Sequence, residues 1–218
     1  MFKAILYSQW KTSRWLIAVG TVASFAIPVL SVRQLGVPSP APWQAVEALN
    51  AVQAWGLWYP LLAFVLTGLL STYTWHGDIT GKHVYALSLP VPRWNYVLMR
   101  LSAGLVLLAL PVIAVWVGSL VAVSGTTIPQ GLHAYPHALA LRFALAVLVL
   151  YTGLAGLTAM PKQIQLGIGS AVGLLVTLEI LSALVGAHVG FATGPLATLF
   201  EWPGPLQILF ARWVLIDV

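Results

Sequence analysis

Long intervals without Lys, Arg, Asp or Glu constrain this chain more than any other feature. They include the 18 residues between Arg14 and Arg33, the 30 between Glu47 and Asp78, and the 41 between Arg100 and Arg142. A helix rises about 1.5 Å per residue, so about 20 apolar residues reach across a hydrocarbon core roughly 30 Å thick. A lone strand would leave its backbone groups unpaired in lipid. The intervals therefore predict membrane-spanning helices.

Within these intervals and the segment that follows them, the apolar stretches place five spans. Their expected ranges are 15–32, 54–75, 97–123, 138–159 and 164–187. The composition agrees, because 60% of the residues are hydrophobic and only 7% are charged, against about 25% charged in a soluble domain. This excludes a water-soluble enzyme, and the high hydrophobicity excludes a disordered chain. The expected fold is all-α: a polytopic transmembrane helical bundle of five or six spans, in one domain over residues 1–218.

The first 14 residues, MFKAILYSQWKTSR, differ from the spans in their pattern. One helical face holds Lys3, Tyr7, Lys11 and Arg14, and another holds Phe2, Leu6 and Trp10. Such a helix is typical of the membrane interface. The alternative is the charged start of a cleaved signal peptide, which the long first span without a small-residue cleavage site disfavours.

The basic residues predict the orientation of the chain in the membrane. With a cytoplasmic N-terminus, the inner side holds seven of them: Lys3, Lys11, Arg14, Lys82, Arg93, Arg100 and Lys162. The outer side then holds three: Arg33, Arg142 and Arg212. Because cytoplasmic loops carry an excess of Lys and Arg, we expect a multi-pass protein of a bacterial-type cytoplasmic (inner) membrane with its N-terminus inside.

Residues 76–96 join the second and third expected spans on the cytoplasmic side. The stretch HGDITGKHVYALSLPVPRWNYVLMR, residues 76–100, begins with a polar Gly77-Asp78 turn, and Asp78 is a residue type that caps helices. We expect a short helix over residues 79–88, which the prolines at 90 and 92 end. This helix is too polar to lie in lipid, so it favours docking to a soluble partner.

The same loop resembles the first cytoplasmic loop of permease subunits in type-2 ATP-binding-cassette (ABC) transporters. The residues that carry the resemblance are Asp78, Gly81, the run Leu87-Ser88-Leu89-Pro90-Val91-Pro92-Arg93, Tyr96 and Arg100. With the N-terminal helix and the order of spans, the resemblance covers about residues 1–187. It implies that this loop is a coupling helix, which contacts a cytoplasmic ABC ATPase through Asp78, Ile79, Gly81, Lys82, His83, Tyr85 and Arg93.

The resemblance also implies the rest of the assembly. The partners would be the ATPase, a second copy or paralogue of the permease, and membrane lipid, with no role for nucleic acid. No Walker lysine motif, His-Glu-x-x-His or Gly-x-Ser-x-Gly is present. We therefore expect no enzyme activity and no cofactor on this chain; ATP and magnesium would bind the partner. The expected function is ATP-driven transport, as an exporter.

The tail departs from the family, which usually has six spans and a cytoplasmic C-terminus. Residues 188–218 are apolar but contain Glu201, Arg212, Asp217 and three prolines. A straight span would place the Glu201 carboxylate near the middle of the membrane, at a cost of about 2.5–3.5 kcal/mol. We expect an external re-entrant segment, and the alternative is an irregular last span.

Two charged residues in expected spans are candidates for a substrate path. Glu179 lies inside the fifth expected span, where an ionisable group is a functional hypothesis by default. Arg142 lies near the outer end of the fourth. The structural alternative for Glu179 is a pairing with a neighbouring helix, for instance with Arg142 or a Ser or Thr hydroxyl, and the alternative for Arg142 is a simple membrane anchor. His133 and His137 are four residues apart, but Pro136 between them favours an external loop over a metal site.

A different class of function stays open beside transport. The chain could be a non-transporting structural or anchor subunit of a larger membrane complex, and the absence of a recognisable sixth span fits that interpretation. Recovery of an ATPase bound through residues 76–93 would distinguish the two hypotheses.

Overall fold

The computed structural model describes residues 1–33, 43–80, 92–126, 132–184, 204, 206–210 and 212–217. The elements in order are α1 (Phe2–Arg33), α2 (Trp43–Ala54), α3 (Trp58–Thr80), α5 (Arg93–Ser124), β1 (His133–Ala134), α6 (Pro136–Ala159), α7 (Lys162–Leu184), α9 (Gln207–Phe210) and β2 (Ile216–Asp217). They form two compact units, Met1–Ala155 with Arg212–Val218, and Gly156–Ala211.

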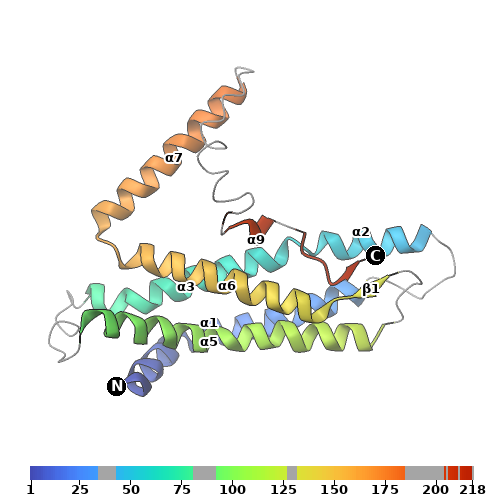
Figure 1. The fold of residues 1–218 in the computed structure, drawn as a ribbon, viewed down its shortest axis with the longest axis horizontal. Helices are drawn as coiled ribbons and strands as arrows, with labels where there is room; N and C mark the ends of the chain where they lie inside the picture. Colours follow the sequence, from blue (N-terminus) through green and yellow to red (C-terminus); the bar gives the residue numbers. More distant parts are fainter. Residues whose placement is uncertain are drawn as a thin grey trace. The chain divides into compact units, whose positions relative to one another are not determined.

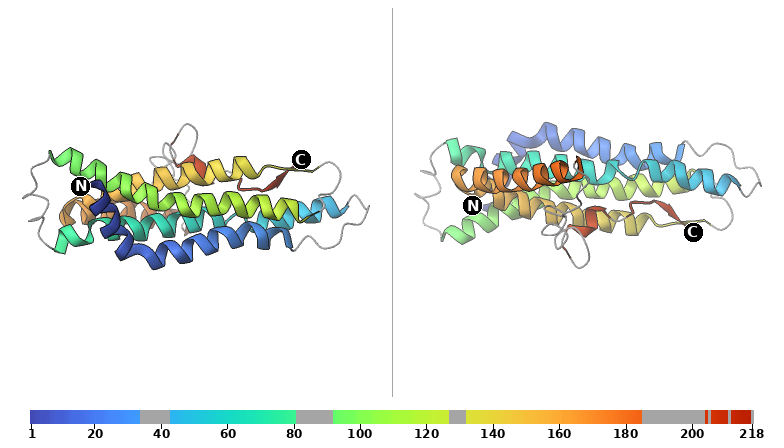
Figure 2. Two further views of the ribbon diagram at one scale, coloured as in Figure 1. Left: turned by 90° about the horizontal axis from the view of Figure 1, so that it is seen from below. Right: turned by 90° about the horizontal axis from the view of Figure 1, so that it is seen from above.

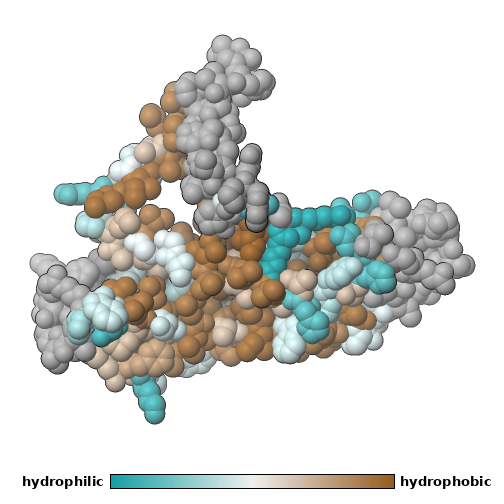
Figure 3. All heavy atoms as spheres, in the orientation of Figure 1, coloured by the Kyte–Doolittle hydropathy of each residue, from teal (hydrophilic) through white to brown (hydrophobic). Residues whose placement is uncertain are grey.

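Among the described residues, four helices are long and apolar enough to cross a membrane. They are Phe2–Arg33, Leu49–Trp75, Trp94–Ser124 and Pro136–Ala159. Large apolar side chains lie exposed along them, and Figure 3 shows hydrophobic residues over much of the visible face of these helices. In water such a surface would be a liability, whereas lipid covers it without cost. The helical character expected from the sequence is therefore confirmed, and four helices in the described part of the chain are candidate membrane spans.

Two of the differences between the observed and the expected helix boundaries lie at residues 1–14 and at the end of α3. Residues 1–14 do not form a separate helix, because α1 runs without interruption from Phe2 to Arg33; its first turns bend away from the rest (Figure 2). At the other place α3 continues through Gly77 and Asp78 to Thr80, where a turn was expected. A glycine inside a helix costs only about 1 kcal/mol, which is too little to end a helix by itself.

The two ends of the first unit hold different parts of the chain (Figure 1). Met1, the end of α3 and the start of α5 lie at what we call the N-terminal end. The ends of α1 and α5, the strand β1 and residues 212–217 lie at what we call the C-terminal end. The helices α1, α3, α5 and α6 run between the two ends.

The closest helix pair in this unit is α1 and α5, which lie side by side in Figures 1 and 2. The buried face of α1 is formed largely of small residues: Gln9, Ser13, Ile17, Gly20, Ser24, Pro28, Ser31 and Val32. A Cβ atom added to Gly118 of α5 would lie 2.6 Å from the Phe25 carbonyl oxygen. The two backbones are thus in direct contact, which is how small residues pack membrane helices together.

Several buried hydroxyl groups in this core bond to their own helices. Ser13 donates to the Gln9 carbonyl at 2.8 Å, Thr67 to Ala63 at 2.6 Å and Thr74 to Leu70 at 2.8 Å. Each bond links a side chain to the carbonyl four residues earlier, a pattern that satisfies Ser and Thr inside helices. Such a bond lets these polar side chains lie in an apolar core.

The second unit contains α7 and α9. Pro161 precedes α7, and the Gln165 side-chain amide donates to the carbonyls of Met160 at 2.7 Å and Thr158 at 3.2 Å. The Gln165 side chain thus satisfies carbonyl groups of the connection that precedes α7. The 23 residues of α7 match the length of the fifth span expected from the sequence.

Candidate functional site

The Arg100 guanidinium at the N-terminal end lies against two aromatic rings. Its central carbon is 5.5 Å from the centre of the Trp75 ring and 5.3 Å from that of Tyr96. Tyr96 precedes Arg100 by one turn on α5, whereas Trp75 lies near the end of α3. A cation over an aromatic face is attracted by the ring quadrupole, by about 0.5–2 kcal/mol. The two helices that flank residues 81–91 are therefore held together at this point.

Further hydrogen bonds join the same region to α1 and α6. Gln9 donates its amide to the Arg100 carbonyl at 3.2 Å, and Trp75 donates its indole N–H to the Ala155 carbonyl at 3.0 Å. The Thr74 hydroxyl is 3.1 Å from the Tyr151 hydroxyl. We call Thr74, Trp75, Tyr96, Arg100 and Tyr151 the basal cluster. It links α3, α5 and α6 near the end of α3 and the start of α5, the helices on either side of residues 81–91 in the sequence.

The predicted partner-binding residues lie mostly outside the part of the chain that the structure describes. Asp78 and Ile79 belong to the last turn of α3, and Arg93 is the first residue of α5; the description of these three residues extends to the backbone alone. Gly81, Lys82, His83 and Tyr85 fall outside the described residues. The partner contacts assigned to all seven therefore stay predictions.

A second cluster lies at the C-terminal end, around Trp213. This residue is 5% exposed; its ring stacks on Tyr59 with centroids 5.9 Å apart and meets the edge of Phe143 at 6.5 Å. The Arg142 guanidinium lies 4.8 Å from the ring centre and donates to the Arg212 carbonyl. Burying an aromatic side chain of this size is a major contribution to stability. Trp213 thus anchors residues 212–217 between α3 and α6.

Backbone contacts reinforce this anchor. β1 and β2 pair antiparallel, with His133 opposite Asp217 and Ala134 opposite Ile216. The Tyr135 N–H donates to the Leu215 carbonyl at 2.9 Å. A Cβ atom on Gly56 would lie 2.6 Å from the Trp213 carbonyl oxygen, so only glycine lets the chain pass so close.

The side chain of Arg212 completes the C-terminal cluster. It lies 3.4 Å from a carboxylate oxygen of Asp217. With its amide oriented to face the guanidinium, Gln53 also accepts a hydrogen bond from Arg212. The ion pair lies within residues 212–217, and the contact with Gln53 holds this segment against α2.

The structure gives Arg142 contacts that sequence reasoning missed. Its observed neighbours are Trp213 and the Arg212 carbonyl, whereas the sequence suggested Glu179 as a structural partner. Glu179 lies on α7, and its side chain falls outside the described part of the structure. The signal for this contact in the sequence is weak, because Trp213 lies in an apolar tail whose neighbouring residues do not indicate its packing partner.

The two histidines of the predicted loop lie on different elements. His133 lies on β1 and His137 in the first turn of α6. His137 accepts a hydrogen bond at its Nδ1 from the Trp116 indole N–H at 3.0 Å. In the described ranges no three His, Cys, Asp or Glu side chains gather closely enough to hold a metal ion.

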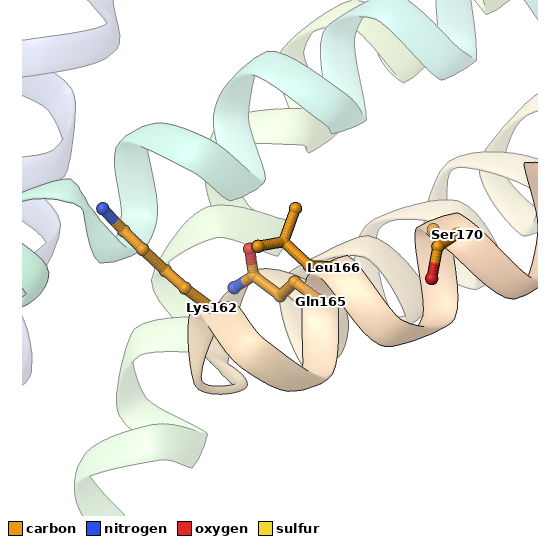
Figure 4. A pocket seen from close by; sticks show the side chains of 5 residues that line it. Lys162, Gln165, Leu166 and Ser170 are labelled. Atoms are coloured by element: carbon orange, nitrogen blue, oxygen red, sulfur yellow. The ribbon is translucent and has the colours of Figure 1, made fainter.

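A shallow pocket on the second unit has few groups that could bind a ligand. Lys162, Gln165, Leu166, Gly169 and Ser170 line it, and Figure 4 shows the labelled side chains along one helix, α7. The Gln165 amide is already occupied by the connection before α7. A surface provided by one helix with one cation does not enclose a ligand.

Comparison with protein-family models, curated proteins and solved structures finds no match to this chain.

Proposed function

We propose that this chain is the membrane-spanning permease subunit of an ATP-driven transporter, in which residues 76–93 receive force from a separate cytoplasmic ATPase. The observation that carries the proposal is the basal cluster, which joins α3 and α5, the helices that flank residues 81–91 in the sequence, to each other and to α6. A partner that pushes on this segment would move α3 and α5 together rather than bend a loose connection. The resemblance of residues 76–100 to a coupling loop indicates that the partner is an ABC ATPase.

The distribution of basic residues supports the orientation. The N-terminal end contains Lys3, Lys11, Arg14 and Arg100 on α1 and α5, as a cytoplasmic end should. We place the N-terminus in the cytoplasm of a cell with a bacterial-type inner membrane. We further propose α7 as a fifth span and the first turns of α1 as an interfacial segment.

In this proposal the energy comes from ATP and magnesium bound to the partner. Closure of the ATPase would press on Asp78, Lys82 and Arg93, and the basal cluster would pass the movement to α6. Helix pairs would then rock and expose a path alternately to each side. Glu179 and Arg142 are candidates for that path, and a second permease copy would complete it. Export is the direction we favour.

The test is purification of the full chain in mild detergent from membranes of its native cell, with bound proteins identified by mass spectrometry. We expect an ABC ATPase in stoichiometric amount. Asp78→Asn and Arg93→Gln should each reduce the recovered ATPase severalfold, because a docking helix depends on charge complementarity. Arg33→Gln is the matched control, since Arg33 lies at the opposite end of α1.

Two outcomes would contradict the proposal. Recovery of no ATPase, in a preparation that keeps the bundle folded, would favour a structural or anchor subunit of another complex. Equal loss of ATPase in the Arg33 control and in the loop variants would show that binding does not pass through residues 76–93.

A further inference from the structure

The C-terminal end contains a small cavity that neither the coupling loop nor the basal cluster uses. Its volume is about 270 Å³, and it is lined by Tyr135, Ala138, Leu139, Arg142, Arg212, Val214 and Asp217. Whole drug-sized ligands occupy sites of about 300–1,000 Å³. The space here therefore fits a headgroup better than a complete substrate.

The charges that line the cavity favour an anion. Two guanidinium groups, Arg142 and Arg212, face it with one carboxylate, Asp217. Arg212 is half exposed, and its ion pair with Asp217 spans 3.4 Å, so an incoming anion could compete for it. A guanidinium has five N–H donors in a planar fork that matches phosphate oxygens. Arg142 can therefore hold the Arg212 carbonyl and meet a phosphate as well.

The depth of the cavity points to a membrane lipid. From Arg142 to Ala159, the end of α6, the rise of ~1.5 Å per residue gives about 26 Å, close to the ~30 Å of a hydrocarbon core. Arg142 thus lies near one edge of the core, at the level of lipid headgroups. Below it on α6, Leu145 and Leu148 are each 42% exposed and offer an apolar surface for acyl chains. Leu139 and Val214 form an apolar lining next to the charges.

We propose that this cavity binds the phosphate headgroup of an anionic phospholipid, with Arg142 and Arg212 on the phosphate and the acyl chains along α6. This lipid site does not rest on the proposed transport function, although it shares Arg142 with the proposed substrate path. Asp217 limits its affinity, because the carboxylate competes with the phosphate for Arg212. Residues 212–217 therefore contribute side chains to the lipid site as well as packing against the C-terminal end of the unit.

Native mass spectrometry of the purified chain tests the proposal with three ligands: phosphatidylglycerol, phosphatidylcholine with the same acyl chains, and water-soluble glycerol phosphate. We expect phosphatidylglycerol to bind best. Arg142→Gln and Arg212→Gln should each weaken it by about tenfold, as the loss of a charge-assisted hydrogen bond does. Arg33→Gln, at the same end of the unit, should leave it unchanged.

Asp217→Asn separates this role from a purely structural one. If Asp217 competes with the lipid, its neutralisation should raise phosphatidylglycerol affinity severalfold, whereas loss of a merely structural ion pair would lower it or leave it unchanged. Because Arg142→Gln also removes packing on Trp213, Arg212→Gln, which alters a half-exposed side chain, keeps the test valid if the former fails to fold.

Three results would overturn the proposal. The first is equal binding of phosphatidylglycerol and phosphatidylcholine. The second is glycerol phosphate binding as tightly as the lipid, which would make free phosphate esters the ligand. The third is a phosphatidylglycerol affinity that falls or stays unchanged in Asp217→Asn.

Discussion

The Arg142 guanidinium lies 4.8 Å from the centre of the Trp213 ring, which joins the start of α6 to an extended segment near the end of the chain. The ring is 5% exposed and touches Tyr59 and Phe143 as well. One aromatic side chain thus connects α3, α6 and residues 212–217. This relationship makes the C-terminal segment part of the helical core.

Replacement of Trp213 by alanine should destabilise the bundle strongly. Truncation of a buried aromatic costs about 3–5 kcal/mol, because packing is lost and a cavity is left. Thermal unfolding in detergent should show a clear fall in the midpoint. Trp58→Ala is the matched control, because Trp58 is 51% exposed and its truncation should change the midpoint little. An equal fall in both variants would contradict the assigned burial.

Alanine substitutions at two glycines should change stability in opposite directions: Gly118 lies in the contact between α1 and α5, whereas Gly153 lies on α6. In Gly118→Ala the new Cβ would meet the Phe25 carbonyl oxygen at 2.6 Å, and overpacking of this kind costs about 1–3 kcal/mol. At Gly153 of α6 nothing lies within 4 Å of the position that an alanine methyl group would take, so Gly153→Ala should stabilise its helix by up to about 1 kcal/mol. Denaturation of both variants in the same detergent measures the difference. A neutral Gly118→Ala would mean that the backbones are further apart.

The hydroxyl pair of Thr74 and Tyr151 should show measurable coupling. The two oxygens are 3.1 Å apart in the core, and interhelical hydrogen bonds in membranes contribute about 0.6 kcal/mol on average, with a maximum near 1.7. A double-mutant cycle with Thr74→Val and Tyr151→Phe, measured by unfolding free energy, isolates this pair. Strictly additive effects would show that the two hydroxyls do not interact.

The pairing of β1 with β2 can be tested directly, because the chain contains no cysteine. Ala134 lies opposite Ile216, and directly paired residues have Cα atoms about 4.5–5.5 Å apart, within disulfide reach. The double variant Ala134→Cys with Ile216→Cys should crosslink on mild oxidation. Cleavage after Lys162 would then leave the two fragments joined until reduction.

The control for this crosslink shifts one residue. Ala134→Cys with Leu215→Cys places the second thiol on the other side of the strand, so it should crosslink far less. Equal crosslinking in the two pairs would mean that the register is not fixed.

Single cysteines in the same background test the orientation. Ser8→Cys lies near the N-terminal end and Ser124→Cys at the end of α5, and both positions are exposed. If the positive-inside pattern holds, a membrane-impermeant maleimide should label Ser124→Cys in intact cells and Ser8→Cys only after permeabilisation. The reverse pattern would invert the proposed topology and remove the coupling segment from the cytoplasm.

The sequence predicted the long helices well because lipid makes their signal strong. Charges at Arg14, Arg33, Arg100 and Arg142 bound the apolar intervals, and α5 and α6 begin and end within a few residues of the expected limits. Placing a charged side chain inside lipid costs so much free energy that charged residues mark the ends of membrane-spanning segments. Local hydropathy was therefore sufficient for α5 and α6.

The contacts between distant segments could not be predicted in this way. Nothing near Trp213 in the sequence indicates Tyr59 or Arg142, since an apolar tail is equally consistent with a span, an interfacial helix or a packed extended segment. The basal cluster was partly visible, because Tyr96 and Arg100 belong to the motif that carries the family resemblance. Trp75, which faces Arg100 from α3, has the sequence context of an ordinary interface residue.

The contact between Gly118 and Phe25 has a mechanical consequence. Two helices whose backbones touch cannot slide along or roll over each other without a steric clash. We therefore expect α1 and α5 to move as one rigid body. A displacement applied at the start of α5 would therefore move α1 as well. Any pivot in the bundle has to lie where α3 and α6 pack more loosely against this pair.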